Sequence, residues 1–207
     1  MEVHTRHTPS SGVARLLLTG GESVRAEQAA MMASSFGMAV GRHPGRSGLR
    51  GQDNGAAVFT APADGGWIDI APPHPGDVYP LELDGQTGWC VAMDAVLAQA
   101  VTVRVTPRWP GLQALFGSDA GFLQHCGGSG PIVLCAVGAV DAFALQPGEL
   151  MTMSPGHLLA YPDTMQCRLR ALDPAAPQSL RTGEGLAFDF AGPGTVLART
   201  RRPRAYD

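Results

Sequence analysis

The sequence predicts an all-β protein made of three consecutive, strand-rich units, and three observations support this fold class. The 207 residues include 27 glycines and 17 prolines but only 16% charged residues, a composition that favours short strands and turns over long surface helices. Apolar and polar residues alternate in several short runs, as they do in strands that bury one face. Glycines recur at a nearly constant step, which indicates an internal repeat.

The repeat is defined by glycines about 64 residues apart. One set separates the apolar runs in VFTAPADGGWIDIA, LQHCGGSGPIVLCA and FDFAGPGTVLA, and it predicts three hairpins with glycine-rich turns. A second set precedes apolar runs and predicts strand-turn-strand corners. The first set is Gly66, Gly130 and Gly194, and the second is Gly21, Gly85 and Gly148.

The domain organisation follows from this spacing. No linker separates the units, and a single unit cannot easily hide its apolar face. We therefore expect one compact, pseudo-threefold domain over residues 1–207. Its internal repeats are predicted at approximately 15–78, 79–141 and 142–202, followed by a tail at 203–207.

Strict alternation predicts individual strands within the units. The apolar members of each run should face the core, while the polar residues between them face water. These apolar members are Leu81 and Leu83; Val101, Val103 and Val105; Met165, Cys167 and Leu169; and Phe188 and Phe190.

Residues 22–33, ESVRAEQAAMMA, form the one stretch whose composition favours a helix, because Ala, Glu, Gln and Met have high helix propensity. Aligned on the repeat, this stretch matches ELMTM at 149–153, which has a strand pattern. We therefore predict a strand here, with a helix as the alternative.

Charge and segment composition exclude several partners and locations. A net charge of −3 and a pI near 6.0 argue against nucleic acid as a partner. The apolar stretch Val13–Leu18 is interrupted by Arg15 and is too short for an export signal or a membrane span. We expect a cytoplasmic protein without direct membrane insertion. The run Arg199, Arg201, Arg202 and Arg204 is interpreted as part of a solvated tail.

The cysteines and methionines are interpreted as packing residues. Cys90, Cys126, Cys135 and Cys167 have no C-x-x-C spacing, so we expect reduced thiols, with a Cys126–Cys135 redox couple as the alternative. A set of methionines is predicted to fill the core, with a flexible partner groove as the alternative. This set is Met31, Met32, Met93, Met151 and Met153.

Five stretches carry a resemblance to a known family: GESVRAEQAAMM, APPHPGDVYPLELDG, WPGLQALFGSDAGFLQHCGGSGPIVL, LQPGELMTMSPGHLLAY and EGLAFDFAGPGTVLARTR. These stretches span nearly the whole chain. In these stretches and in their order the sequence resembles the bacterial and mitochondrial proteins named for altered inheritance of mitochondria. The resemblance implies a TRAP-like fold, similar to that of the tryptophan-attenuation RNA-binding protein: a β-sandwich or short double-stranded β-helix, repeated within one chain. It also implies, for mitochondrial members, a part in inner-membrane organisation, whereas bacterial members have no settled activity.

One glycine of the family pattern is kept only in the last repeat. Gly156 matches the family's turn glycine, whereas Ala29 and Ala95 replace it in the two earlier repeats. A positive φ angle is expected where the pattern has glycine.

The sequence contains no motif for metal binding or catalysis, since the six histidines form no H-E-x-x-H or zinc-type set. We expect no catalytic residue, no metal and no cofactor. His74 and Asp77 in PPHPGD resemble an acid/base pair, and His157 in SPGHLLAY follows a turn, so these three residues are the candidate ligand contacts. The alternative is structural: a proline-rigid turn held by Asp77, and hydrogen-bonded histidines.

These observations favour a non-catalytic binding or scaffold protein that organises an unknown protein partner, with a homo-oligomeric edge or face as one way to do so. Two alternatives stay open. One is a small-ligand-binding module that uses a rim or inter-unit cleft, and the other is an enzyme with an unrecognised site.

Overall fold

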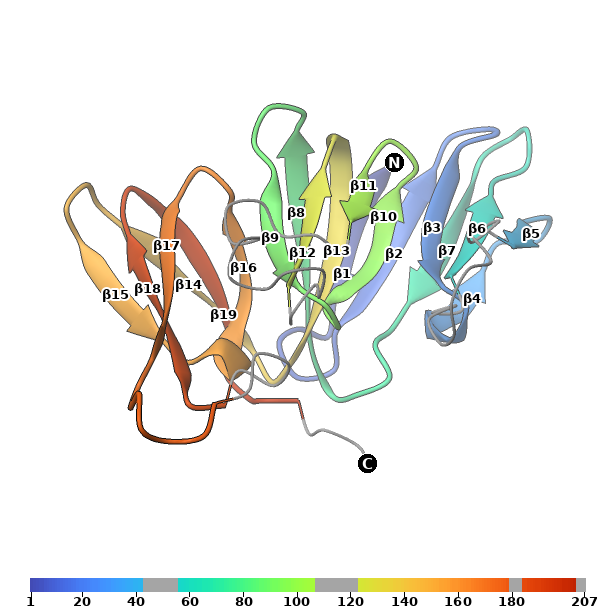
Figure 1. Cartoon of the computed structure of the whole chain (residues 1–207). Helices are drawn as coiled ribbons and strands as arrows, with labels where there is room; N and C mark the ends of the chain where they lie inside the picture. The colour runs from blue at the N-terminus through green and yellow to red at the C-terminus, as the bar shows by residue number, and fades with distance from the viewer. Residues whose placement is uncertain (43–55, 107–122, 179–183, 204–207) are drawn as a thin grey trace.

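The structure, a computed structural model, describes residues 1–42, 56–106, 123–178 and 184–203. In these ranges every regular element is a β-strand, apart from two short 3-10 turns, η1 (Gln28–Ala30) and η2 (Pro155–His157). The strands form antiparallel sheets in a sandwich-like body (Figure 1). The all-β prediction is confirmed. No helix within the described ranges is long and apolar enough to cross a membrane.

The strands fall into three groups of six, which we call units 1, 2 and 3, preceded by β1 (Glu2–Arg6). Unit 1 contains β2 (Val13–Leu18), β3 (Ser23–Glu27), β4 (Met31–Ser34), β5 (Ala39–Arg42), β6 (Ala56–Thr60) and β7 (Gly66–Ile70). Unit 2 contains β8 (Gly76–Asp84), β9 (Trp89–Ala92), β10 (Val96–Ala100), β11 (Arg104–Thr106), β12 (Leu123–Gly127) and β13 (Ser129–Val137). Unit 3 contains β14 (Val140–Leu145), β15 (Leu150–Met153), β16 (Leu158–Pro162), β17 (Gln166–Ala171), β18 (Leu186–Ala191) and β19 (Gly194–Arg199).

All three units have the same strand pairing. The sixth strand pairs with the first and the third, and the fifth strand pairs with the second and the fourth. The third strand has a register shift at the same place in each unit, just before Ala33, Ala98 and Ala160. This shared bulge identifies equivalent residues in the three units. Superposition of the three backbones and the pseudo-threefold symmetry stay predictions.

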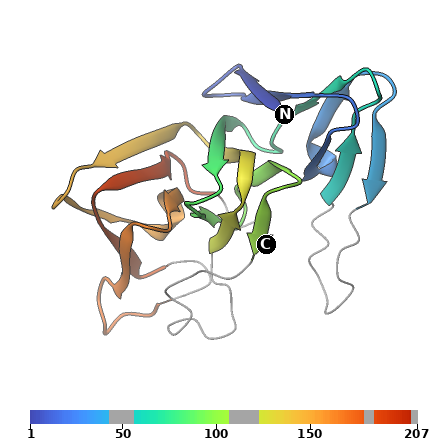
Figure 2. The same cartoon turned by 90° about the horizontal axis from the view of Figure 1, so that it is seen from above.

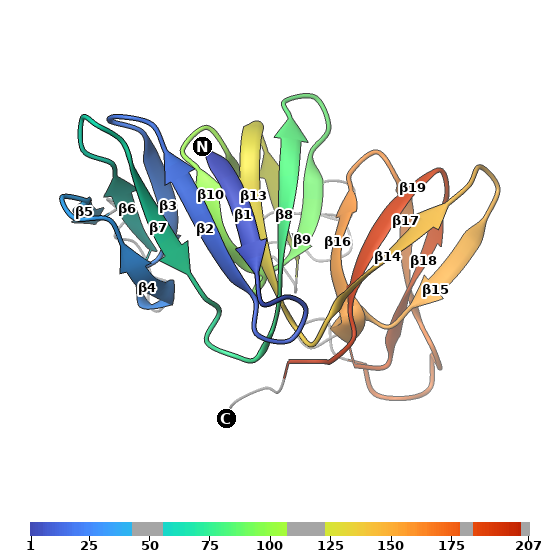
Figure 3. The ribbon, with the colours of Figure 1, turned by 180° about the vertical axis from the view of Figure 1, so that it is seen from behind.

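The units are joined by pairing the second strand of one unit with the third strand of the next. β3 pairs with β10, and β9 pairs with β16. These two joints create two six-stranded sheets, so the units lie in a row with unit 2 in the middle (Figure 2). β1 lies between β2, with which it pairs, and β8, which it also contacts (Figure 3).

The joints also build the cores, because each of the first two cores contains residues of the following unit. The core of unit 1 includes Leu97, Ala98 and Val133 from unit 2. The core of unit 2 includes the equivalent residues of unit 3, which are Leu159, Ala160 and Leu197. Burying one such leucine contributes about 1.5–3 kcal/mol, so neighbouring units stabilise each other.

Five of the ten predicted core residues are buried, and four more are partly buried against a core. Phe188 and Phe190 pack in the core of unit 3 with Met165, as their alternation indicated. Val101 differs: it is exposed, because residues 101–102 form a turn before β11 begins. The strand prediction for residues 22–33 is confirmed, since this stretch contains β3 and β4 with only the single turn η1 between them.

The predicted hairpins are wrong. The strands that flank Gly66, Gly130 and Gly194 do not pair with each other, because in each unit the fifth and sixth strands lie in different sheets. An apolar run, a glycine-rich turn and a second apolar run describe a corner between two packed sheets as well as they describe a hairpin. The predicted corners, in contrast, are confirmed: Gly21, Gly85 and Gly148 have φ angles of 75°, 81° and 86°.

Gly156 is not needed for a positive φ angle, contrary to the expectation from the family pattern. It lies in η2, and the equivalent turn η1 is built with Ala29 in the same place. A Cβ atom at Gly156 would instead lie 2.4 Å from Nε of Arg202. The glycine therefore leaves room for an arginine side chain.

Candidate interaction surface

Asp77, predicted as part of an acid/base pair, has its carboxylate bound to backbone amides. Its Oδ1 accepts the N–H of Val78 at 2.9 Å, and its Oδ2 accepts the N–H of Val140 at 3.1 Å. The second bond links β8 to β14, and Asp77 is buried at this junction of units 2 and 3. The geometry is that of a structural link.

His157 and Arg199 form one partly buried network. Nδ1 of His157 donates to the carbonyl oxygen of Arg199 at 2.9 Å. The Arg199 side chain donates from Nη1 to Oδ2 of Asp94 at 2.7 Å and from Nε to the carbonyl of Gly156 at 3.2 Å. Arg199 ends β19 and is 7% exposed, so its assignment to a solvated tail was wrong. The sequence could not show this, because Asp94 is far away along the chain.

His74 lines a cavity of about 250 Å³ beside the joint between units 1 and 2, and unit 3 also contributes to its lining. Pro72, Pro73, Cys135 and Arg199 also line it. The structure therefore brings His74 to the same cavity as the Arg199 side chain, with His157 bonded to the Arg199 backbone. Asp77 is outside the lining.

A second hollow of about 470 Å³ flanks the same joint between β3 and β10. Arg25 and Gln99, which lie opposite each other in the joint, both line it. Nη1 of Arg25 donates to the carbonyl of Val103 at 3.2 Å, whereas its buried Nε has no hydrogen-bond partner among the described residues. In the next joint the equivalent pair is Cys90 and Tyr161, which pack into the core of unit 3.

The cysteines behave as packing residues. No disulfide forms, and Cys126 and Cys135 lie on β12 and β13, which belong to different sheets. Burial raises the pKa of Cys126 and of Cys135 to about 12, so neither thiol is poised to ionise. In the described part of the chain no group of three or more His, Cys, Asp or Glu residues is placed to hold a metal ion.

One histidine–carboxylate pair was missed in the sequence. Nε2 of His125 on β12 lies 2.9 Å from Oδ2 of Asp163, which follows β16. The pair crosses the joint between units 2 and 3, and it lies over Gly88, where a Cβ atom would be 2.3 Å from His125. No local motif contains both residues, so only the pairing of β9 with its neighbours reveals them.

The sheet edges differ in how they are protected against further pairing. Eight of the described strands end a sheet: β1, β4, β5, β8, β11, β14, β15 and β17. Six of them contain a charged residue, and β8 also contains a proline, which are the usual devices that block edge-to-edge association. β4 (MMAS) and β15 (LMTM) contain neither.

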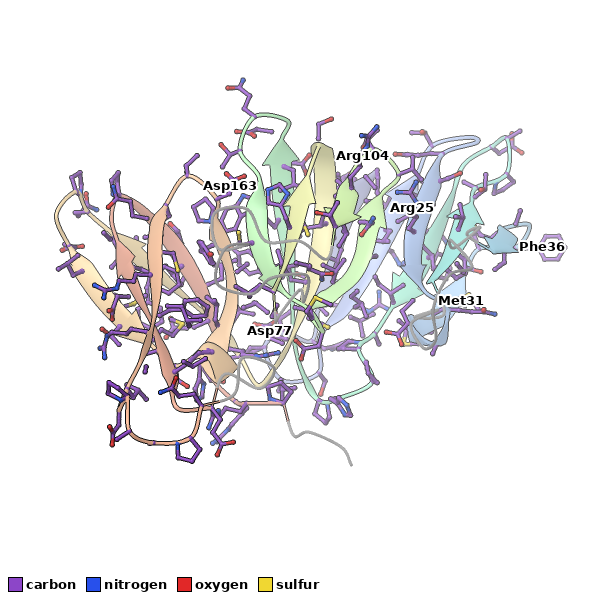
Figure 4. All side chains as sticks on the ribbon, viewed as in Figure 1. Arg25, Met31, Phe36, Asp77, Arg104 and Asp163 are labelled. Atoms are coloured by element: carbon purple, nitrogen blue, oxygen red, sulfur yellow. The ribbon has the colours of Figure 1, made fainter. Side chains whose placement is uncertain are left out.

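These two unprotected edges also carry exposed apolar side chains. Met32 on β4 is 53% exposed, Leu150 on β15 is 80% exposed, and Phe36, just after β4, is fully exposed. Figure 4 shows Phe36 pointing away from the body at the outer end of unit 1. The prediction that Met31 and Met32 fill the core is therefore wrong, whereas Met153 is buried as predicted. We call β4 with Phe36 the unit 1 edge and β15 the unit 3 edge.

Comparison with known proteins places this architecture in a family. The crystal structure of protein SPYM3_0169 from Streptococcus pyogenes matches it with a TM-score of 0.75 and 19% sequence identity, over 97% of this chain and 94% of that chain. This likeness shows a shared fold. No curated protein matches the sequence. The model of the family described as mitochondrial biogenesis AIM24 matches residues 3–201, and the chain therefore belongs to the AIM24 family.

Proposed function

We propose that this chain is a non-catalytic binding or scaffold protein that engages protein partners through the unit 1 edge and the unit 3 edge. The observation that carries the proposal is that β4 and β15 alone among the described sheet-terminal strands lack both charge and proline. An open strand edge binds a further strand through main-chain hydrogen bonds, and neighbouring apolar side chains add contact area.

The positions of the two edges suit a scaffold. They belong to units 1 and 3, which lie on opposite sides of unit 2, so one molecule can hold two partners at once (Figure 1). Bivalent engagement raises the effective concentration of each partner near the other. We also propose a cytoplasmic location. We expect no nucleic-acid partner, because the net charge is −3 and the arginines form no broad basic patch in the sequence.

Affinity capture from the native cell tests the proposal. The full chain is tagged at its C-terminus, because the N-terminal amine forms an ion pair with Glu22. We expect one stoichiometric protein partner with the wild type, and its loss when Met32→Lys and Leu150→Lys are combined. Val40→Lys is the matched control, since Val40 is as exposed as Met32 but lies on β5, an edge that already contains an arginine. Retention of the partner by the double variant, or recovery of no partner, would contradict the proposal.

The cavity beside His74 favours a second candidate function, a small-ligand-binding module. Its walls combine proline and cysteine with the Arg199–Asp94 ion pair, which suits a small apolar molecule with one polar group. Native mass spectrometry of protein purified from its own cell should then show a bound small molecule that is lost in His74→Ala. An unchanged bound mass in His74→Ala, or none in the wild type, would exclude this candidate.

A further inference from the structure

We infer that the partner of both edges is a second copy of this chain, with the unit 1 edge of one copy paired to the unit 3 edge of the next. The inference rests on the proposed function and identifies its partner. The joint between units is made twice within the chain, each time from a second strand and the third strand of the following unit. β15 is the second strand of unit 3, and β4 is the third strand of unit 1. Each molecule therefore has two open strand edges, and these are the two complementary halves of a joint that it already forms between its own units.

The side chains at β4 support this pairing. The bulge residue of the third strand is Leu97 in unit 2 and Leu159 in unit 3, and these are only 2% and 0% exposed, because each packs in the core of the preceding unit. The equivalent residue of unit 1 is Met32, which is 53% exposed. Met32 is thus a large apolar side chain at a position that is otherwise buried by a preceding unit. A second copy would supply that unit.

Unit 1 departs from its equivalents at one position on this face. Asp69 is equivalent to Val133 of unit 2 and Leu197 of unit 3, each of which packs in the core of the preceding unit. Asp69 is already 1% exposed, and its carboxylate is bound by Arg6 and Arg15 of the same chain. A second copy therefore needs to supply no counter-charge for it.

The two existing joints also fix the register of the new one. Ala98 lies opposite Ala26, and Ala160 lies opposite Val91. Ala26 and Val91 each lie two residues before the turn that follows the second strand of their unit. The same register places Ala33 of one copy opposite Met153 of the next.

Continuing this register along both antiparallel strands sets Ser34 opposite Thr152 and brings Phe36 next to Leu150. Phe36 and Leu150 have the highest exposed fractions of all large hydrophobic side chains in the described ranges, at 102% and 80%. The register thus covers these two side chains with each other. No charged residue of either strand faces the joint.

A joint of this type is heterologous, because it uses two different surfaces. Repeated head to tail, it gives a closed ring or an open filament, depending on the rotation between copies. This property separates it from a symmetric dimer and makes a mixing experiment decisive.

Purified full-length protein is followed by light scattering and sedimentation over a concentration series. The wild type should assemble, whereas Met32→Lys, with a blocked unit 1 edge, and Leu150→Lys, with a blocked unit 3 edge, should each associate at least about tenfold more weakly. Mixing the two variants should restore one 1:1 complex, because each provides the edge that the other lacks. Val40→Lys should assemble as the wild type does, and circular dichroism checks that all variants are folded.

Several results would overturn the inference. These are a monomeric wild type at every concentration, unchanged assembly of both variants, or stable dimers of either variant alone. A monomeric wild type whose captured partner still depends on the two edges would reject self-assembly but leave the proposed function intact. If no chain, including a second copy of this one, is captured in a way that depends on the two edges, both self-assembly and the proposed function are rejected.

Cross-linking tests the register. Copies with Ser34→Cys are mixed with copies with Thr152→Cys and oxidised, and they should form a disulfide-linked dimer that the wild type does not form. Copies with Ser34→Cys and Leu150→Cys are the control and should link much less. Equal linking of both mixtures would refute the register.

Discussion

Replacing Asp69 with asparagine tests how strongly the Arg6–Asp69–Arg15 cluster stabilises the fold. Asp69 lies on β7, and its carboxylate accepts two hydrogen bonds from each arginine at 2.6 to 3.2 Å. Hydrogen bonds from Arg15, opposed by burial and aided by Arg6, lower the pKa of Asp69 from 3.8 to about 2. The folded state therefore prefers the ionised carboxylate.

This preference can be converted to a stability. The lowered pKa corresponds to about 2.4 kcal/mol in favour of the charged form. The two arginine side chains are 34% and 37% exposed, so solvent screening reduces the expected contribution to about 1–2 kcal/mol. Because the folded pKa lies below the unfolded one, this stabilisation is fully present above about pH 4 and disappears as the pH falls towards about 2.

Urea unfolding of the wild type and Asp69→Asn measures the effect. Tryptophan fluorescence is the probe, and Trp67 contributes to it next to the cluster, since Arg15 lies 4.1 Å from the centre of its ring. The variant should lose about 1–2 kcal/mol at neutral pH, and the difference should shrink between about pH 4 and pH 2. Asp189→Asn is the control and should lose less, because the side chain of Asp189 is 33% exposed, whereas that of Asp69 is 2% exposed. Equal stability of Asp69→Asn and wild type at neutral pH, or a loss independent of pH, would refute the reasoning.

Three further predictions concern the packing. Phe188→Ala should lower the free energy of unfolding by about 3–5 kcal/mol in urea titrations because Phe188 is fully buried, whereas Phe36→Ala should leave it unchanged; similar losses would contradict the burial. Gly76→Ala should fold poorly or not at all, since its Cβ would lie 1.9 Å from a carbonyl oxygen of β13. Gly148→Ala has open space around its Cβ and should cost only about 1–2 kcal/mol of backbone strain. Expression yield and thermal melts compare the two variants, and equal stability would contradict the clash at Gly76. Cys135 should react with iodoacetamide at about pH 8 far more slowly in the native protein than in urea, because burial raises its pKa to about 12; equal rates by mass spectrometry would contradict this.

The sequence was informative wherever a feature is local. Alternation around Asp189 predicts which side of β18 is buried, because the period of a strand is a property of neighbouring residues. The turn glycines at 21, 85 and 148 were found for the same reason, since a positive φ angle favours glycine whatever the tertiary structure. The strand pattern at residues 22–33 required one more step, the comparison with residues 149–153, because composition alone favours a helix there.

The sequence was not informative about which strands pair. The pattern around Gly66 and its two counterparts predicts hairpins where the structure has corners, because periodicity does not say to which sheet a strand belongs. The same gap hid the His125–Asp163 pair and the burial of Arg199, whose partners are distant in sequence. It also hid the open edges, since Met32 has the apolar character of its buried equivalents and only the missing neighbour leaves it exposed.

The sharing of cores between units has a consequence for how the protein is made. The core of unit 1 contains Leu97 and Val133, so it stays incomplete until residues far beyond β7 have left the ribosome. The core of unit 2 waits in the same way for Leu197 on β19, the last strand of unit 3. Domains usually fold as units during translation, and exposed strand edges promote aggregation before folding is complete. The nascent chain therefore carries unfinished hydrophobic surfaces until β19 emerges, and chaperone binding should be strongest before that point.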